Sequence, residues 1–312
     1  NFDETRPNIS DICVSIHGVG VTEMTVYNLG SINADYVYKV PRLPGAGETI
    51  AARSVSRGLG GKGANMSVAA ARAAAHVCHI GCLGPDGAWA GERLLEYGVD
   101  TRFITSQPEP TGHAIIAVDT NAENNILLYP GANQMIPQEV IGAALSQAHA
   151  GDWLLAQNET NNQIYGVTTA KTLGLSVAYA AAPFDVDAVQ AVMGSLDLLI
   201  LNAVEAAQLH QATGLTAAQL PVRDVIVTLG AKGCVWYGAD GQKTFEAMAV
   251  EPVDTTGAGD TFTGYVLAGL DRGMPMAQAI GLGTKAAGLM VTRLGTADVI
   301  PDLKDLQDAQ LI

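Results

Sequence analysis

The sequence predicts an α/β fold, with a mostly parallel central sheet flanked by helices and a small β-sheet lid. Short apolar, β-branched runs alternate along the 312-residue chain with alanine-rich segments of helical length. These runs are apolar throughout, which indicates strands covered on both faces, as in parallel sheets. Residues 32–56 and 111–129 instead have strand-like content and turn signals without a helix. We expect these two stretches to pair as the lid; an ordinary edge hairpin is the alternative for residues 111–129.

The elements of the main layer follow one another in a regular order. Each expected strand is a short apolar, β-branched run, and each expected helix is an alanine-rich segment of helical length. The expected strands are Thr25–Gly30, Val77–Leu83, Trp153–Ala156, Ser176–Tyr179, Leu198–Leu201 and Val225–Leu229. The expected helices are Ala64–Ala75, Ala88–Tyr97, Pro137–Ala148, Asn162–Leu173, Val186–Met193, Ala203–Thr213, Asp260–Asp271 and Met276–Arg293.

The N-terminal segment, residues 1–23, differs from the rest of the chain. It precedes the first persuasive strand and has no basic region leading into an apolar one, as a secretory signal would. We interpret it as an N-terminal extension of unclear role, followed by a single domain at residues 24–312.

The charge of the chain excludes several classes of partner. It carries 17 Lys and Arg against 31 Asp and Glu, a formal net charge of −14. Such a surface repels phosphate backbones, and no cluster of basic residues offsets it, so nucleic acid is not an expected partner. No apolar stretch reaches the roughly 18 to 20 residues that a membrane helix needs. We therefore expect a soluble, cytoplasmic protein that binds neither nucleic acid nor membrane.

The four cysteines are too few for a disulfide scaffold in a chain of this length, which favours a reducing compartment. Cys78 and Cys82, with His79 between them, could suggest a metal site. No second pair of ligands follows downstream, so buried thiols are the favoured interpretation.

A glycine-rich segment precedes the first expected helix. Its letters GLGGKG, residues 58–63, formally match the dinucleotide-binding pattern, but they do not follow the first strand, as that pattern requires. A helix that begins near Ala64 would instead present the backbone N–H of Gly61 and the Lys62 ammonium to a ligand. With Asn65 in the first turn, this corner predicts a site for a polar or anionic ligand. A tight turn that requires glycines is the alternative.

The segment DTTGAGDTFTG, residues 254–264, carries the strongest chemical signal. Gly257, Ala258 and Gly259 form a loop whose N–H groups converge at the start of a helix and create an anion hole. Asp260 then lies in the first helical turn, where the helix end favours its ionised form, and it could accept a proton. A base beside an anion hole suits phosphoryl transfer. The alternative is a plain helix cap, and the chain has no Walker motif.

Several motifs in a fixed order resemble the ribokinase/phosphofructokinase-B carbohydrate kinase family over residues 24–301. The combination of GGKGAN with SINAD is typical of the ribokinase branch of that family. The motifs are GSINADYV (30–37), PGAGETI (44–50), GGKGAN (60–65), PGAN (130–133), QNE (157–159), NAVE (202–205), TLGAKG (228–233) and DTTGAGD (254–260).

The resemblance assigns the substrate-binding roles. It implies that Asp260 is the catalytic base and also contacts the sugar, and that Gly257, Ala258 and Gly259 form the catalytic anion hole. Glu159 matches an acidic sugar contact, with a solvated carboxylate at a strand end as the alternative. The implied sugar-binding residues are Asn33, Asp35, Gly61, Lys62, Asn65, Glu159 and Asp260.

The resemblance also implies a nucleotide site for ATP with Mg²⁺. Glu205 matches a residue that holds Mg²⁺ through water, and its spacing from Asn202 would put both on one helical face. A surface charge on a helix is the alternative for Glu205. Many relatives place Asn or His near the adenine, where this chain has Gly-Thr-Lys at residues 283–285, which leaves the base selectivity open. The implied nucleotide-binding residues are Asn202, Thr228, Gly230, Gly257 and Gly259.

A monovalent cation, K⁺ or similar, is a further implication of the resemblance. In the family, a loop corresponding to Asp254 and Thr256 and a second one corresponding to Arg293 and Gly295 jointly surround the ion with oxygen atoms. Val299 departs from the family, which commonly supplies a hydroxyl near that position.

The resemblance and the residues together lead to one expected function. The protein would transfer the γ-phosphoryl group of ATP to O5 of D-ribose and give ribose 5-phosphate. A kinase for deoxyribose, another sugar or a nucleoside is the alternative, and a sugar-binding regulator without catalysis is a further one. Relatives often pair through their lids, so we also expect a homodimer, which would protect the exposed strand edges.

Overall fold

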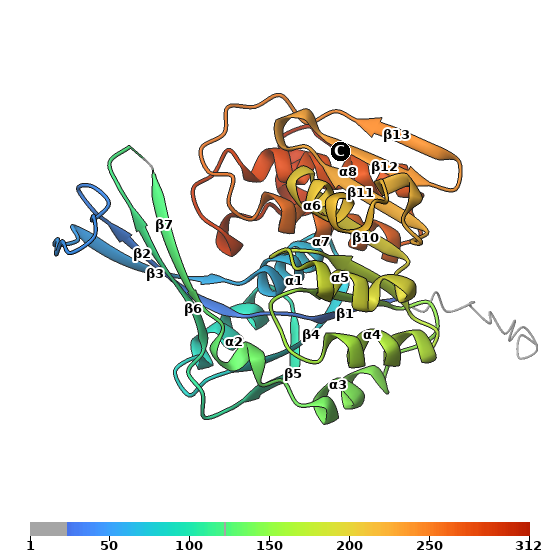
Figure 1. The fold of residues 1–312 in the computed structure, drawn as a ribbon, viewed down its shortest axis with the longest axis horizontal. Coiled ribbons are helices and arrows are strands. Elements are labelled where there is room, and N and C mark those ends of the chain that lie inside the picture. Colours follow the sequence, from blue (N-terminus) through green and yellow to red (C-terminus); the bar gives the residue numbers. More distant parts are fainter. Residues whose placement is uncertain (1–23, 122) are drawn as a thin grey trace, which may run out of the picture.

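The computed structural model describes residues 24–121 and 123–312, so the expected extension at residues 1–23 lies outside the described residues. A nine-stranded sheet forms the centre of the molecule, and a four-stranded sheet projects from it as a lid (Figure 1). The strands of the main sheet are β1 (Thr25–Leu29), β4 (His76–Leu83), β5 (Asp100–Ser106), β8 (Trp153–Gln157), β9 (Ser176–Ala180), β10 (Leu198–Asn202), β11 (Asp224–Thr228), β12 (Cys234–Gly238) and β13 (Gly241–Phe245).

The main sheet is mostly parallel, as the sequence predicts. Its strand order is β13-β12-β11-β10-β9-β8-β1-β4-β5, and the pairs from β11 to β5 are parallel. Only the β11–β12 and β12–β13 pairs, at one edge of the sheet, are antiparallel. All six strands that we expected occur, with shifts of about one residue at their ends. Every residue of β8 is buried, which confirms that the central strands are covered on both faces.

The eight expected helices also occur. Their ends differ from the expected ends by up to three residues, because cap geometry decides where a helix stops. Their bounds are α1 (Lys62–Arg72), α2 (Ala88–Glu96), α3 (Gln138–Leu145), α4 (Gln163–Thr172), α5 (Val186–Val192), α6 (Ala203–Thr213), α7 (Ala258–Asp271) and α8 (Met276–Met290). None of the helices in the described part of the chain is long and apolar enough to cross a membrane.

Three β-strands and one α-helix of the described chain were not expected from the sequence. They are β5, β12, β13 and the short helix α9 (Leu303–Asp308). The three strands lie at the two edges of the sheet and are half-buried or exposed along much of their length, so they lack the continuous apolar pattern of central strands.

The lid consists of β2 (Asn33–Lys39), β3 (Ser54–Gly60), β6 (Gly112–Val118) and β7 (Asn124–Tyr129), in the order β3-β2-β6-β7. The strands β6 and β7 do form a hairpin, but β6 also pairs in parallel with β2. The two stretches therefore form one lid, as expected, and the edge-hairpin alternative is wrong. The first lid segment extends to Gly60, beyond the expected end at residue 56, and leads directly into α1.

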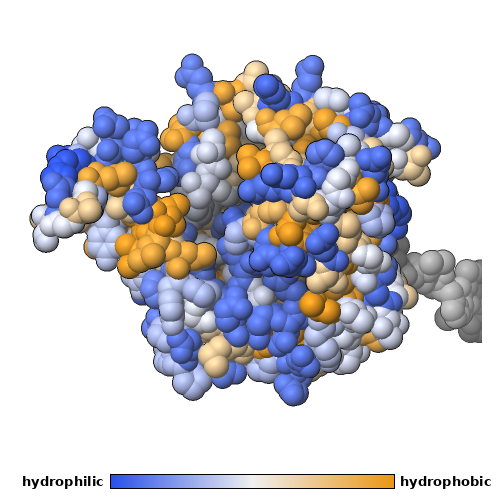
Figure 2. All heavy atoms as spheres, viewed as in Figure 1, coloured by the Kyte–Doolittle hydropathy of each residue, from blue (hydrophilic) through white to orange (hydrophobic). Residues whose placement is uncertain are grey.

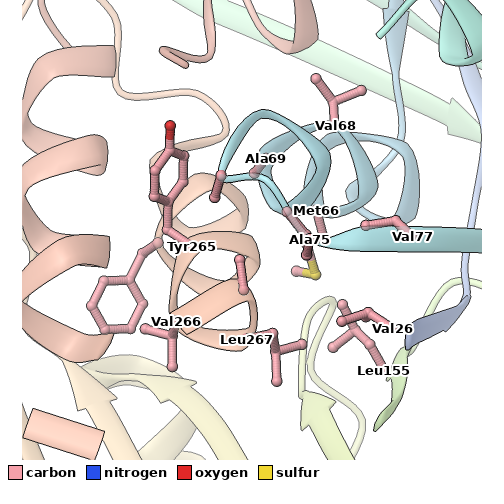
Figure 3. Packing of buried hydrophobic residues seen from close by; sticks show 14 of the residues in the cluster. Val26, Met66, Val68, Ala69, Ala75, Val77, Leu155, Tyr265, Val266 and Leu267 are labelled. Atoms are coloured by element: carbon pink, nitrogen blue, oxygen red, sulfur yellow. The ribbon is translucent and has the colours of Figure 1, made fainter. Parts of the chain in front are cut away.

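The helices α1 and α7 pack closely against each other on one face of the main sheet. Figure 3 shows Met66 and Ala69 of α1 in the same cluster as Tyr265 and Leu267 of α7, above the sheet. A side chain at Gly264 would meet the backbone oxygen of Met66 at 2.6 Å, so glycine permits this close crossing. The crossing brings the N-termini of α1 and α7, which carry the two glycine-rich motifs, to the same region of the molecule.

Candidate active site

The first sugar-binding candidate, Asn33, begins β2 just after the end of β1 and is buried. Its Oδ1 accepts a hydrogen bond of 2.8 Å from Nδ2 of Asn133. Asn133 is itself fixed, because its Oδ1 accepts from the backbone N–H of Ile32 at 2.9 Å. Asn33 thus keeps its own amide N–H groups available as donors in a fixed orientation. Asn133 belongs to the PGAN motif, and the sequence did not reveal its supporting role.

Asp35 lies over the backbone of Gly60, on the neighbouring lid strand. A Cβ at Gly60 would lie only 2.0 Å from Oδ2 of Asp35, so no other residue leaves room for this carboxyl group. Burial and the nearby negative charges of Glu159 and Asp260 raise the pKa of Asp35 to about 7, although Lys62 opposes the change. In the unliganded protein this carboxyl group is therefore partly protonated at neutral pH.

Glu159 follows β8 and reaches across to the start of α1. Its Oε2 accepts a hydrogen bond from the backbone N–H of Lys62 at 3.1 Å and another from the Ser31 hydroxyl. Burial raises the pKa of Glu159, although these two hydrogen bonds and the Lys62 charge lower it in part. The solvated-carboxylate interpretation is wrong, because Glu159 is partly buried and holds the N-terminus of α1.

The Lys62 ammonium interacts electrostatically with four carboxylates. Burial by itself would lower the pKa of the Lys62 ammonium, but Asp260, Glu159, Glu205 and Asp35 together raise it. Lys62 is therefore charged at neutral pH, and its charge faces an excess of negative groups. This arrangement suits a ligand that combines hydroxyl groups with a transferable anionic group.

Asp260 is buried in the first turn of α7, and its Oδ2 accepts a hydrogen bond of 2.8 Å from Nδ2 of Asn65. Burial raises the pKa of Asp260, while Lys62 and Asn65 lower it in part. We expected the helix end to favour the ionised form, and burial outweighs that effect. Oδ1 of Asn65 is buried without a hydrogen-bond partner in the described chain, which makes it an acceptor for a ligand hydroxyl.

The loop before α7 has the geometry of an anion hole. Gly257 is the N-cap residue and has a left-handed φ of 77°. The N–H of Ala258 donates to the Thr255 carbonyl at 3.3 Å, so this group is partly occupied. Within the described residues, no backbone carbonyl accepts from the N–H groups of Gly257, Gly259 or Asp260. Free N–H groups at a helix N-terminus bind anions.

Asn202 and Glu205 do not lie side by side on one helical face, as we expected, but cap the N-terminus of α6 together. Asn202 is the N-cap residue of α6, and its Oδ1 accepts from the N–H groups of Val204 and Glu205, both at 2.9 Å. Oε2 of Glu205 in turn accepts from the Asn202 N–H at 2.8 Å, which completes a capping box. The surface-charge interpretation of Glu205 is wrong, because Glu205 is buried and its negative charge helps to raise the pKa of Lys62.

A pocket of about 330 Å³ lies beside the anion-hole loop. Thr228 and Gly230, which follow β11, line it together with Ala258 and Gly259 of the loop, as the nucleotide assignment requires, whereas Asn202 is not among its lining residues. Most of the remaining wall is apolar, and sequence reasoning missed it, since an apolar loop residue carries no chemical signal. These wall residues include Met248, Val250, Pro252, Phe262, Ala287 and Val291.

The two expected cation-binding loops meet at Asp254. Its Oδ1 accepts from the Thr256 N–H at 2.9 Å, and its Oδ2 accepts from the Gly295 N–H at 3.3 Å. The Arg293 side chain is engaged elsewhere, because it forms an ion pair with Asp305 at 3.0 Å. The loops are thus adjacent, while the Asp254 carboxylate is already satisfied by backbone N–H groups.

Comparisons with known proteins agree with this geometry. The model of the pfkB family of carbohydrate kinases matches residues 25–303. A ribokinase of Haemophilus influenzae is 34% identical over 292 residues, which cover 89% of this chain and 95% of that protein.

Two solved structures share the fold. A ribokinase from Thermotoga maritima has a TM-score of 0.83 and 31% identity, and the match covers 91% of this chain and 98% of that chain. The ribokinase of Arabidopsis thaliana, complexed with ribose and ATP, has a TM-score of 0.79 and 28% identity over 92% of this chain and 98% of that chain. The family match along almost the whole described length shows that the chain belongs to the pfkB family of carbohydrate kinases.

Proposed function

We propose that this protein transfers the γ-phosphoryl group of ATP to O5 of D-ribose and gives ribose 5-phosphate. The observation that carries the proposal is the position of Asp260, a buried carboxylate next to free N–H groups at the start of α7. A base and an anion hole at one point are what phosphoryl transfer to a hydroxyl requires.

The sugar would bind between the lid and the start of α1. Asn33 would donate to sugar hydroxyls, and Asp35, Glu159 and the free Oδ1 of Asn65 would accept from them. Several fixed polar groups that converge on one small ligand give both orientation and specificity. Lys62 and the backbone of Gly61 would contact the same ligand from the helix corner.

Asp260 would take the proton of the attacking hydroxyl at its carboxylate oxygen. Because burial raises the pKa of Asp260, its ionised form is a stronger base than that of an exposed aspartate. Asn65 holds the carboxylate in place through its 2.8 Å hydrogen bond. The N–H groups of Gly257 and Gly259 would stabilise the charge on the transferred phosphoryl group.

Mg²⁺ accompanies ATP in this family. Within the described residues no group of three or more His, Cys, Asp or Glu side chains could hold a metal ion by itself, which suits Mg²⁺, since it is usually held by one or two carboxylates together with water and the phosphates of the substrate. Glu205 would hold the ion through water, since its Oε2 already closes the capping box. When bound, Mg²⁺ neutralises negative charge on the phosphates.

We extend the proposal to a monovalent cation, K⁺ or similar, between the loops that meet at Asp254. The support is the 3.3 Å hydrogen bond between Asp254 and Gly295, which brings both loops together beside the anion hole. Carbonyl oxygens of Thr256, Arg293 and Gly295 would supply most of the ligands, because Val299 offers no side-chain oxygen.

A homodimer through the lid is the remaining part of the proposal. Figure 2 shows hydrophobic residues gathered on the lid, in the region of β7. Four consecutive residues of β7 are at least 41% exposed, and covering them would remove apolar surface from water. Sedimentation of the native protein and of a Leu127→Asp variant tests this, because only the native protein should dimerise. These residues are Ile126, Leu127, Leu128 and Tyr129.

A coupled assay of ADP release over a panel of sugars and nucleosides tests the activity. We expect D-ribose to have the highest kcat/KM, with product phosphorylated at O5 in a ³¹P spectrum. A preference for deoxyribose or a nucleoside would favour the alternative kinases. Sugar binding without any ADP release would indicate the non-catalytic regulator.

A further inference from the structure

A chain of four buried polar side chains lies beneath the proposed sugar site. Asn28, Ser67, His79 and Gln157 come from β1, α1, β4 and β8, and none is more than 1% exposed. The mechanism above uses none of them. Because a buried polar group destabilises the fold unless it is hydrogen-bonded, four such groups in contact require an explanation.

The first part of the chain joins β8 to α1 through β1. Nε2 of Gln157 donates to Oδ1 of Asn28 at 2.7 Å. Nδ2 of Asn28 then donates to both the Gly63 carbonyl and the Ser67 hydroxyl oxygen, each at 2.8 Å. A carbonyl can only accept, so the contact with Gly63 determines which end of the Asn28 amide faces α1.

The second part continues from α1 to β4 and returns to the end of β1. The Ser67 hydroxyl lies 2.8 Å from Nδ1 of His79, and Nε2 of His79 lies 3.1 Å from the Gly30 carbonyl. Since that carbonyl can only accept, Nε2 carries the proton. Burial lowers the pKa of His79 to about 4, so the ring is neutral and Nδ1 accepts from Ser67. Four of these five hydrogen bonds thus run in one direction, from Gln157 to Gly30, and the fifth branches from Asn28 to the Gly63 carbonyl.

The chain connects the segments that carry the sugar-binding residues. Gly30 directly precedes the segment that leads into β2, Gly63 lies in the first turn of α1, and Gln157 lies two residues before Glu159. A Cβ on Gly63 would lie 2.5 Å from the Gly30 Cα, so these two backbones are also in close contact. A change in any link would shift the relative positions of β1, α1 and β8 at the point where the sugar binds.

We propose that Ser67 and His79 are positioning residues, which act through Asn28 and the Gly30 carbonyl to hold the three parts of the sugar site in register. The proposal rests on the proposed function, since it assumes that the site binds ribose. It predicts a defect in sugar binding that is separate from nucleotide binding, because the ATP pocket shares no residue with the chain.

The test replaces one link and measures the binding of each substrate by calorimetry. Ser67→Ala removes a single oxygen atom and leaves Nδ1 of His79 without its donor. We expect ribose to bind about tenfold more weakly, because the loss of this link would misplace the segments that carry the sugar-binding groups, and small misplacements have effects of about that size or larger. A non-hydrolysable ATP analogue should bind as it does to the native protein, and Ser67→Thr, which keeps the hydroxyl, should restore ribose affinity.

Tyr179→Phe is the matched control. It removes a buried hydrogen bond of 2.7 Å between Tyr179 and Gln163, which joins β9 to α4 and belongs to no substrate site. We expect it to lower the stability in urea and to leave ribose affinity unchanged. If Ser67→Ala behaves like this control, the chain has only a structural role and the proposal is overturned.

The native protein provides a second measurement that does not depend on a variant folding. The ¹⁵N signals of the His79 ring should show a protonated Nε2 at neutral pH and should shift when ribose binds, but not when the ATP analogue binds. If the ¹⁵N signals of the His79 ring do not shift when ribose binds, the proposal is contradicted. The same ribose titration tests the proposed function separately, because that function fails if the native protein does not bind ribose.

Discussion

Replacement of Asp35 by asparagine should stabilise the unliganded protein at alkaline pH and weaken its binding of ribose. Burial, with the charges of Glu159 and Asp260, raises the pKa of Asp35 from its ordinary value of 3.8 to about 7 in the folded state. Each tenfold change in an ionisation constant corresponds to about 1.36 kcal/mol, so the ionised carboxylate destabilises the folded protein by about 4 kcal/mol. The gain from Asp35→Asn should not exceed that value.

The sign of the pH dependence follows from the direction of the shift. Between about pH 4 and pH 7 the unfolded chain has released the Asp35 proton, while the folded protein retains it, so this group lowers the free energy of unfolding as the pH rises. Above about pH 7 both states are ionised, and the full destabilisation remains. The stabilisation by Asp35→Asn should therefore be near zero at pH 4, intermediate at pH 5.5 and largest at pH 8.

Asp35→Asn should weaken ribose binding, although it stabilises the unliganded protein. In the proposed function the ionised Asp35 carboxylate would accept hydrogen bonds from sugar hydroxyls, and no donor of the described chain bonds to it. An asparagine amide offers one acceptor in place of two oxygens, so we expect a tenfold to hundredfold loss of affinity at pH 8, or about 1 to 3 kcal/mol. In the native protein, affinity should fall below pH 7, where the carboxyl group is protonated.

Urea unfolding at pH 5.5 and pH 8, followed by calorimetric titration with ribose, measures both effects. Glu251→Gln, at an exposed loop carboxylate, is the control and should change neither quantity. The reasoning is wrong if Asp35→Asn is less stable than the native protein at pH 8, or if its stability relative to the native protein is the same at both pH values.

Four further outcomes are expected. Asp260→Asn should lower kcat by about 10² to 10⁴ while ribose affinity is kept, because it removes the base; a collapse of affinity at near-normal turnover would make Asp260 a ligand instead. 2-Deoxyribose should have a kcat/KM about tenfold to hundredfold below ribose, since a missing hydroxyl leaves polar groups such as Asn33 unpaired, and equal values would contradict the ribose assignment. K⁺ should raise kcat relative to tetramethylammonium at equal ionic strength, and Val299→Ser should increase the affinity for K⁺; no effect in either protein would mean that the cation site is absent. GTP should support turnover within about tenfold of ATP. The pocket wall is mostly apolar, and the Thr284 hydroxyl already donates to the Ile280 carbonyl at 2.9 Å, so these groups do not distinguish one base from the other. Strict use of ATP would point to recognition of the base by the backbone.

The central part of the fold could be predicted from the sequence because its signal is local. A buried parallel strand such as β8 is apolar at its first four positions, and a helix such as α1 is a long alanine-rich segment, so each is visible within a few residues. The edge strand β5 was missed for the same reason. It is partly exposed and mixes polar with apolar residues, and its pairing with β4 depends on contacts that the local pattern does not contain.

Some features of the candidate site could likewise be predicted from local sequence, and others required the structure. Lys62 and Asp260 were identified because glycine-rich loops at helix starts have a local signature, and the family motifs located the other polar residues. Asn202 and Glu205 have the spacing of a capping box at a helix start, but the family motif led us to expect a shared helical face, and the structure shows the capping contacts instead.

The sequence by itself determined the order of the central strands and the longer helices, the acidic surface and the residue types at the site, because all of these depend on composition and on neighbours along the chain. Only the tertiary structure decided the ionisation of Asp35, whose pKa of about 7 results from burial and from Glu159, a residue far away in the sequence. It also decided the chain from Gln157 to His79, whose members come from four separate elements. Electrostatic and hydrogen-bond energies depend on distance in space, and folding alone brings such residues within reach of one another.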